Sequence, residues 1–205
     1  LVGKASDGTQ TFTKDIEPWF DGEFAFAVGP LPKDALSGES SAAADARALI
    51  LLSIKDQAAA SAWFSGVLAD TETPSTTETY EGVTITVVTP GGDTAMSAAF
   101  AILGGNVAVA GDLASVKAAI DTNGSQSLAS DPDFKAASGA PKDDYFGFAY
   151  VNAQALAGSA LDASGADGSS VMAFGQSLTD LVPDWIAFDL RVEPDALVGT
   201  ANTPH

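Results

Sequence analysis

The sequence predicts an α+β fold: an antiparallel or mixed sheet with helices mainly on one face, arranged as two uneven strand–helix–strand repeats. The clearest sign is the stretch 98–110, where two apolar runs flank Gly104-Gly105-Asn106 and a helical pattern follows Asp112. Similar corners, in which a strand is followed by a capping residue and a helix, recur at Asp56 and Asn152. The strands between the first two corners have an antiparallel pattern and do not resemble a doubly wound sheet.

The N-terminal part contains an alternating strand, a long loop and a central strand. Residues 23–28 (EFAFAV) alternate and place two phenylalanines on one face. Residues 29–45 contain prolines and a Gly/Ser/Ala-rich run, so we expect a mobile, insertion-tolerant loop. Residues 46–54 form an apolar run, which predicts a central strand. A helix is predicted over 57–68, because its apolar positions recur at helical spacing.

The corner after the glycine-rich turn is predicted in more detail. Gly111 is expected to break the strand, and Asp112 to begin the helix. The Asp112 carboxylate is then expected to accept a hydrogen bond from the backbone N–H of Ala114 or Ser115. Asn123-Gly124 is a typical helix stop.

The remaining elements are short. Polar residues 70–79 predict a loop, and Pro132 at a first helical position predicts a short helix that Gly139 ends. A further helix is expected over 171–181, and the segment 182–205 is expected to be a C-terminal hairpin that starts a second repeat. The remaining strands are predicted from short runs rich in Val, Ile, Phe and Tyr: residues 83–87, 145–151, 185–192 and 196–201.

Charge excludes one large class of partner. The 205 residues include 27 Asp and Glu against 9 Lys and Arg, for a formal net charge of −18. Binding to phosphates requires clusters of Lys and Arg, whereas Arg47 and Arg191 are the only arginines here. We therefore expect no nucleic-acid partner, and we attribute the charge mainly to solubility.

Cysteine usage and hydropathy indicate the compartment. The chain has no cysteine, which excludes disulfides and cysteine-ligated metal sites and fits an exported bacterial protein. No apolar run reaches the ~18 residues that a membrane span needs, so direct membrane insertion of this fragment is not expected. The length suits a single domain over 1–205, and a start at Leu1 predicts a fragment of a longer protein that is secreted or anchored through another segment.

Nucleophilic catalysis has little support. The only histidine, His205, is the last residue, so a buried Ser–His–Asp triad cannot be assembled. Ser53 and Lys55 share one face of a strand, but a solvent-facing polar pair explains them more simply. Helix capping likewise explains the aspartates and the asparagine at the strand–helix corners better than ligand binding. We assign no catalytic, cofactor-binding or metal-ligating residue.

Weak divalent cation binding and an aromatic ligand groove are minor hypotheses. One acidic stretch holds four carboxylates that a loop could gather around a hard cation: Asp15, Glu17, Asp21 and Glu23. The stretch Asp162–Gly168 is similar to a calcium loop but lacks its alternate ligands and its final glutamate. Four aromatic residues could line a groove, although packing explains them more simply: Trp19, Tyr80, Tyr150 and Trp185.

A succession of stretches resembles a known family. These stretches are ALILLSIKDQAAASAWF, TYEGVTITVV, FAILGGNVAVAGDLASVKAAID, SLASDPDFKAA and DYFGFAYVNAQAL. Over roughly residues 15–195 the chain is similar to bacterial exported proteins that are known only as domain of unknown function 3352. The resemblance implies an extracytoplasmic location, with a signal or anchor and a longer body, and it implies no activity and no site residue.

The leading functional hypothesis is a non-enzymatic module of the bacterial cell envelope that acts in binding or structure. One alternative is a small-molecule or lipid carrier with an apolar cavity between sheet and helices. The other is a hydrolase that uses a pair of carboxylates. The protein or small-molecule ligand itself stays unknown.

Overall fold

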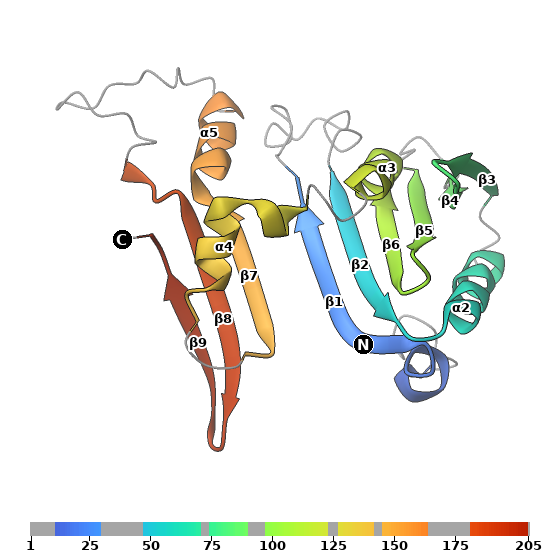
Figure 1. Cartoon of the computed structure of the whole chain (residues 1–205), viewed down its shortest axis with the longest axis horizontal. Coiled ribbons are helices and arrows are strands. Elements are labelled where there is room, and N and C mark those ends of the chain that lie inside the picture. Colours follow the sequence, from blue (N-terminus) through green and yellow to red (C-terminus); the bar gives the residue numbers. More distant parts are fainter. Residues whose placement is uncertain are drawn as a thin grey trace. The chain divides into compact units, whose positions relative to one another are not determined.

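A computed structural model describes residues 11–29, 47–70, 74–89, 97–122, 127–141, 145–163 and 181–204. The chain forms two compact units, one from described residues up to 29 and from 47 to 121, the other from residue 122 onward (Figure 1). Each unit contains one antiparallel sheet with its helices, which confirms the α+β class. Instead of the single domain expected over 1–205, each sheet has an apolar core of its own.

The first unit is a six-stranded sheet in the order β1-β2-β6-β5-β4-β3. Its strands are β1 (Phe20–Val28), β2 (Ala48–Ile54), β3 (Ser75–Tyr80), β4 (Val83–Val88), β5 (Ala98–Leu103) and β6 (Val107–Asp112). Its helices are a π-helical turn η1 (Phe12–Ile16), α2 (Gln57–Asp70) and α3 (Leu113–Thr122). The predicted glycine turn between β5 and β6 is confirmed, with Gly104 and Gly105 at φ +56° and +81°.

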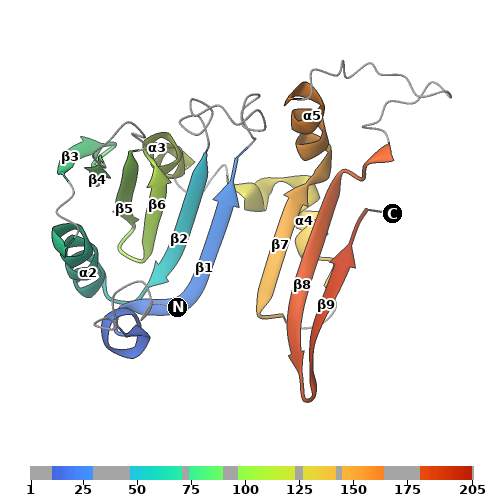
Figure 2. The same ribbon diagram turned by 180° about the vertical axis from the view of Figure 1, so that it is seen from behind.

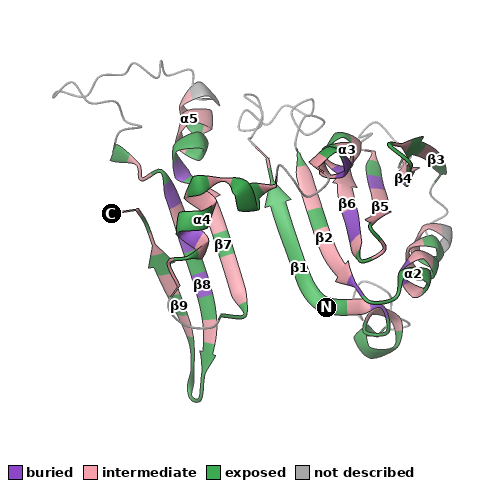
Figure 3. Cartoon of the chain, in the orientation of Figure 1, coloured by how far each residue is buried: buried purple, intermediate pink, exposed green. Residues whose placement is uncertain are grey.

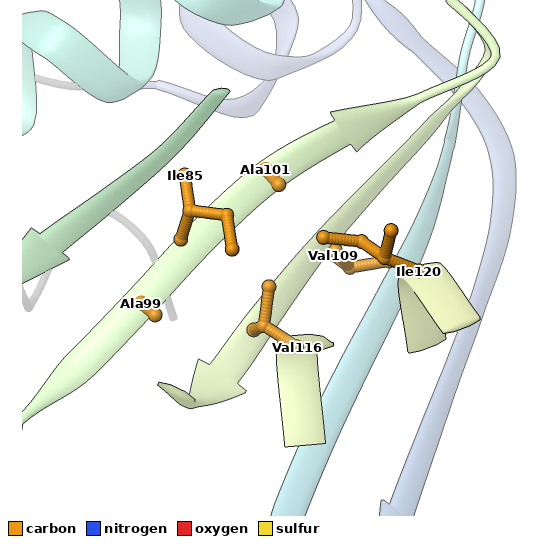
Figure 4. Packing of buried hydrophobic residues seen from close by; sticks show 6 residues of the cluster. All are labelled: Ile85, Ala99, Ala101, Val109, Val116 and Ile120. Atoms are coloured by element: carbon orange, nitrogen blue, oxygen red, sulfur yellow. The ribbon is translucent and has the colours of Figure 1, made fainter. Parts of the chain in front are cut away.

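The two longer helices of this unit contact opposite faces of the sheet. Val116 and Ile120 of α3 pack with Ile85 and Val109 on one face (Figure 4). The cluster around α2 includes Ala108, which lies on the other face because successive strand residues alternate. The expectation of helices mainly on one face therefore does not hold for this unit. The inner strands are apolar on both sides, as a sheet covered on both faces requires.

Two local predictions are wrong. Gly111 does not break the strand, because it pairs with Leu49 and Ala99 within β6. A Cβ at Gly111 would lie 2.1 Å from the Ala48 carbonyl oxygen, so glycine is needed there for close strand approach. Residues 75–79, predicted as part of the loop 70–79, belong to the edge strand β3 (Ser75–Tyr80), whose polar side chains reflect exposure rather than irregular backbone.

The second unit is a three-stranded sheet in the order β7-β8-β9, with β7 (Gly147–Asn152), β8 (Trp185–Glu193) and β9 (Ala196–Asn202). Its helices are a 3-10 turn η3 (Leu128–Ser130), α4 (Pro132–Ser138) and α5 (Ala153–Ala163). The predicted C-terminal hairpin is confirmed, and its strand β8 also pairs with β7. Ala137 of α4 packs with Trp185, Ala187, Phe148 and Tyr150 on one face of this sheet.

Some predictions fall outside the part that the structure describes. They are the loop 29–45 beyond Gly29, nearly all of the helix over 171–181, and most of the acidic stretch Asp162–Gly168. Among the helices that are described, none combines the length and the apolar character needed to cross a lipid bilayer.

Candidate binding surface

The capping residues at the three strand–helix corners do what the sequence predicts. Asp56, Asp112 and Asn152 each accept a hydrogen bond from the backbone N–H three positions later, at 2.9, 2.9 and 2.8 Å. For Asp112 the donor is Ser115, one of the two expected residues. These side chains therefore satisfy the free N–H groups of the first helical turn.

Asp112 is the most heavily engaged of the three. Its second oxygen accepts hydrogen bonds from the Ser115 hydroxyl at 2.5 Å and from the Ala48 N–H at 3.0 Å, and Arg47 donates to the first oxygen at 3.0 Å. Desolvation opposes ionisation, but the bonds from Ser115, Ala48 and Arg47 outweigh it and lower the pKa of Asp112 from 3.8 to about 2. With two donors on each oxygen, this carboxylate fastens the start of β2 to the β6–α3 corner.

The Ser53–Lys55 pair is also explained by structure. The Ser53 hydroxyl donates to the Glu23 carbonyl oxygen at 3.1 Å and accepts from the Glu23 N–H at 3.0 Å. It replaces ladder hydrogen bonds at the register shift of β1, where Gly22 has φ +96°. Its hydroxyl is thus held by backbone, and Lys55 is exposed.

The N-terminal carboxylates are distributed over different elements. Asp15 lies in η1 and accepts a bond from the Thr11 N–H at 2.6 Å, whereas Asp21 and Glu23 lie on β1. Within the described residues, no group of three or more histidine or carboxylate side chains is close enough to hold a metal ion. Weak divalent cation binding stays a minor hypothesis to be tested.

The four aromatic residues pack as the simpler interpretation expects. Trp19 and Trp185 are 2% and 5% exposed and belong to the cores of the first and second units. Tyr80 donates to Asp121 at 3.1 Å, and this hydrogen bond raises the pKa of the phenol. Burial raises the pKa of Tyr150, which packs against the core around α4.

The most unusual surface is the second face of the three-stranded sheet, which we call the bare face. Residues directly opposite one another in adjacent strands share a face, and α4 covers the face that contains Trp185 and Ala187. The other face is apolar at every position: Gly147, Ala149, Val151, Ile186, Phe188, Leu190, Val192, Leu197, Gly199 and Ala201. In Figure 2 no described helix lies across it.

Exposure and shape both mark the bare face. Val192 and Leu197 are 75% and 65% exposed, and Phe188 and Leu190 are 45% and 41% exposed. In Figure 3 the tip of the β8–β9 hairpin is coloured as exposed. A row of Gly147, Leu190 and Gly199 crosses the three strands, so Leu190 stands between two positions without side chains. Beside it lies an open hollow of about 350 Å³, lined by β8 residues 188–190 and β9 residues 199–201.

Charged residues flank the strands of the bare face in sequence. Asp184 lies just before β8, and Asp195 lies in the turn between β8 and β9. Arg191 and Glu193 both lie on the opposite face of β8, where they form an ion pair at 3.5 Å. Residues 122–205 as a whole carry eleven Asp and Glu side chains against three Lys and Arg.

Sequence reasoning did not single out the bare face, although its signal is present. In Trp185–Val192 (WIAFDLRV) the even positions are all large and apolar, and Trp185 and Ala187 on the other face are apolar as well. This pattern is typical of a strand covered on both faces. In the structure, α4 covers only the face that contains Trp185 and Ala187.

Comparison with known families agrees with the succession of stretches noted in the sequence. The family described as protein of unknown function (DUF3352) matches residues 5–179, which is most of the chain. The chain belongs to the DUF3352 family. No curated protein and no solved structure matches it. The DUF3352 match begins before and ends before the range expected from the sequence.

Proposed function

We propose that this DUF3352 chain is a non-enzymatic, extracytoplasmic module of the bacterial cell envelope that acts by binding, with the bare face as its contact surface. One observation supports the proposal most strongly: a sheet face that is apolar at every position keeps its large side chains Phe188, Leu190, Val192 and Leu197 exposed. Exposed contiguous apolar surface is costly in water and typically marks an interaction site.

Among the described residues, the side chains at the strand–helix corners and the Ser53 hydroxyl have structural roles. Asp56, Asp112 and Asn152 cap helices, and the hydroxyl of Ser53 bonds to the backbone of β1. These contacts and the apolar character of the bare face favour binding over the carboxylate-based hydrolase. The family resemblance and the lack of cysteine support a location outside the cytoplasm.

The small-molecule or lipid carrier is the second candidate, because the hollow beside Leu190 is apolar and within the size range of ligand sites. That hollow opens onto the sheet surface, whereas a carrier is expected to enclose its cargo. A broad contact surface therefore fits better than a cavity.

An environment-sensitive hydrophobic dye tests whether the bare face is available for binding. We expect dye fluorescence with the 205-residue chain and a clear loss of signal in the double variant Val192→Lys, Leu197→Lys. The matched control is Phe24→Lys, Phe26→Lys, which alters exposed apolar side chains of β1 in the other unit. An equal signal in wild type and in the Val192, Leu197 variant would contradict the proposal.

Two further measurements test the non-enzymatic role and the location. Turnover of any member of a panel of ester, glycoside, peptide and phosphate substrates would contradict a non-enzymatic role. Protease accessibility of the native protein, on intact bacteria and on cells whose outer layers have been opened, tests the location. Complete protection until the cytoplasmic membrane is broken would place the module in the cytoplasm.

A further inference from the structure

The edge strand β1 ends in an apolar stretch whose side chains do not protect it against pairing. Residues 24–28 (FAFAV) contain no charge and no proline, and each of them is exposed. Natural sheets usually protect an exposed edge with charged side chains or proline. The other edge of this sheet, β3, is polar, and its Glu78 forms an ion pair with Lys117 at 2.7 Å. The edge at β1 is therefore the one suited to pairing with another strand.

Backbone hydrogen bonds show which groups of β1 point away from β2. The N–H groups of Glu23 and Gly29 both bond toward the β2 side, at 3.0 and 2.8 Å. Successive residues of a strand direct their N–H and C=O groups to opposite sides. Phe24, Phe26 and Val28 therefore direct theirs to the outer edge, where β1 has no neighbouring strand in the described sheet. Such a row of outward groups selects an extended strand as the occupant.

The stretch 24–28 is self-complementary in antiparallel pairing. With a two-fold axis at Phe26, the two copies of Phe26 lie opposite one another, and Phe24 of each copy lies opposite Val28 of the other. All outward N–H and C=O groups of the stretch then form hydrogen bonds, because residues in such a pair exchange two bonds. Ala25 of one copy comes opposite Ala27 of the other. The same stretch thus supplies both sides, as an isologous two-fold interface requires.

Charges at the two ends of the stretch favour this antiparallel register. Glu23 of each copy comes opposite Gly29 of the other, and Gly29 is paired with the cationic Arg47. The Arg47 side chain is 52% exposed, and its guanidinium has donors in addition to the one that bonds to Asp112. A parallel arrangement in register would instead place the two copies of Glu23 side by side, which is unfavourable.

The exposed area determines how strong this association can be. Phe24, Phe26 and Val28 are 73%, 63% and 56% exposed, and Ile50, opposite Phe26 in β2, is 41% exposed. Pairing would cover roughly 300–400 Å² per copy, about half of what a standard interface buries on each partner. Backbone hydrogen bonds supply the remaining affinity. We therefore expect a weak dimer, with a dissociation constant on the order of 100 μM.

A second copy is a better occupant than the other strands that could use this edge. It already carries the matching alternation of large and small apolar residues and the opposite order of charges. Pairing of β1 with β3 of another copy would set phenylalanines opposite polar residues and would leave free edges that continue to add copies. Pairing of β1 with itself closes at two copies.

We propose that two copies of this chain pair antiparallel through residues 24–28 of β1, about a two-fold axis at Phe26, so that their six-stranded sheets join edge to edge. The dimer uses the first unit only. It does not rest on the bare face or on the binding function proposed above, so either proposal can fail without the other.

Sedimentation of the 205-residue chain over about 5 to 500 μM tests the dimer. Salt at about 0.3 M screens the repulsion between two copies of charge −18. We expect the mean mass to rise from one chain toward two. Phe26→Pro removes an outward N–H at the axis and is expected to weaken the dimer about tenfold or more, and circular dichroism checks that the variant is folded.

The matched control is Thr77→Pro on β3. The Thr89 N–H donates to the Pro74 carbonyl oxygen at 3.1 Å, so even-numbered residues of β3 face β4 and Thr77 faces the outer edge. This variant also removes one outward N–H, but at the other edge of the same sheet. We expect it to leave the dimer unchanged.

Disulfide formation tests the register, and the absence of cysteine from the natural chain makes the result specific. In the proposed register Ala25 and Ala27 of different copies form a non-hydrogen-bonded pair, with Cα atoms about 4.5 Å apart, which a disulfide can span. Ala25→Cys and Ala27→Cys chains are oxidised separately and as an equal mixture. We expect the mixture to give at least about fivefold more covalent dimer than either variant alone, because only unlike chains place two thiols opposite each other.

Three results would overturn the β1 dimer. The first is one-chain mass at every concentration together with no more covalent dimer in the mixture than in the separate variants. The second is a dimer that Thr77→Pro weakens as much as Phe26→Pro does. The third is a dimer that Val192→Lys, Leu197→Lys abolishes, since that would place the contact on the bare face.

Discussion

The two sheets of this chain differ in how completely their faces are covered. The six-stranded sheet has α3 on one face and α2 on the other, and its central residues, such as Ile85 and Val109, are buried. The three-stranded sheet has α4 on one face, whereas Phe188 and Leu190 on the other face are exposed. The centre of the first sheet is thus buried, whereas its edge at Phe24, Phe26 and Ile50 and the bare face of the second sheet keep apolar side chains exposed.

A pair of truncations tests this difference, and it has the largest expected effect. Ile85→Ala removes a fully buried side chain and is expected to cost about 2–5 kcal/mol of unfolding free energy. Leu197→Ala, on the bare face, is expected to change the unfolding free energy by no more than about 0.5 kcal/mol. Denaturant titration measures both.

Tryptophan fluorescence separates the two units in that titration, because Trp19 and Trp63 report on the first and Trp185 on the second. A cost above about 2 kcal/mol for Leu197→Ala would mean that the bare face is covered in solution.

Alanine substitution at two glycines compares a position where a Cβ would clash with one where it has open space. Gly111→Ala places a Cβ against the Ala48 carbonyl oxygen and is expected to destabilise the first unit by about 1–3 kcal/mol, because β2 must move away. Gly66→Ala in α2 meets nothing within 4 Å and is expected to stabilise by up to about 1 kcal/mol. Thermal melts rank the two, and equal melting temperatures would contradict the tight strand approach at Gly111.

Removing a helix cap in each unit compares how much the two strand–helix corners contribute to stability. Asp112→Ala is expected to cost about 2 kcal/mol, the upper end for a cap, because strand β2 also loses its anchor. Asn152→Ala removes a cap whose side chain accepts one bond, from Ala155, and is expected to cost about 1 kcal/mol. Chemical denaturation monitored by circular dichroism gives both values. A larger loss of unfolding free energy for Asn152→Ala than for Asp112→Ala would contradict the view that Asp112 also anchors β2.

The pH dependence of the first unit follows from the lowered pKa of Asp112. The folded-state pKa of about 2 is below the ordinary value of 3.8, so ionised Asp112 stabilises the fold above pH 3.8. This contribution is lost as the pH falls from 3.8 through about 2. Asp112→Asn is expected to flatten this part of the stability profile, which denaturation at pH 6, 4 and 2.5 measures. An unchanged slope in the variant would assign the acid sensitivity to other carboxylates.

The smallest expected effect is that of calcium. We expect the melting temperature to be the same in excess chelator and in millimolar calcium, because the described carboxylates at residues 15–23 lie on different elements. A rise with calcium would restore the acidic-loop hypothesis. The same melt in millimolar magnesium serves as a control for general charge screening.

The sequence by itself determined the local elements. Helical periodicity and capping residues located α2, α3, α4 and α5, because an N-terminal cap is a short-range interaction between residues three positions apart. The turn at Gly104 and Gly105 was equally predictable, since it needs positive φ. Predictions for single residues failed where a contact with a residue far along the chain sets the local structure. Gly111 is an example, because its backbone lies close to that of Ala48 in β2.

Only the tertiary structure decided which faces of the strands are covered. Apolar residues in WIAFDLRV and in ALILLSI predict buried strands equally well, because periodicity states which side chains share a face and not what packs against that face. Pairing partners many residues apart placed β2 between β1 and β6, and placed β8 between β7 and β9. The bare face therefore follows from the position of α4 on one side of a three-stranded sheet, a long-range arrangement that no local pattern contains.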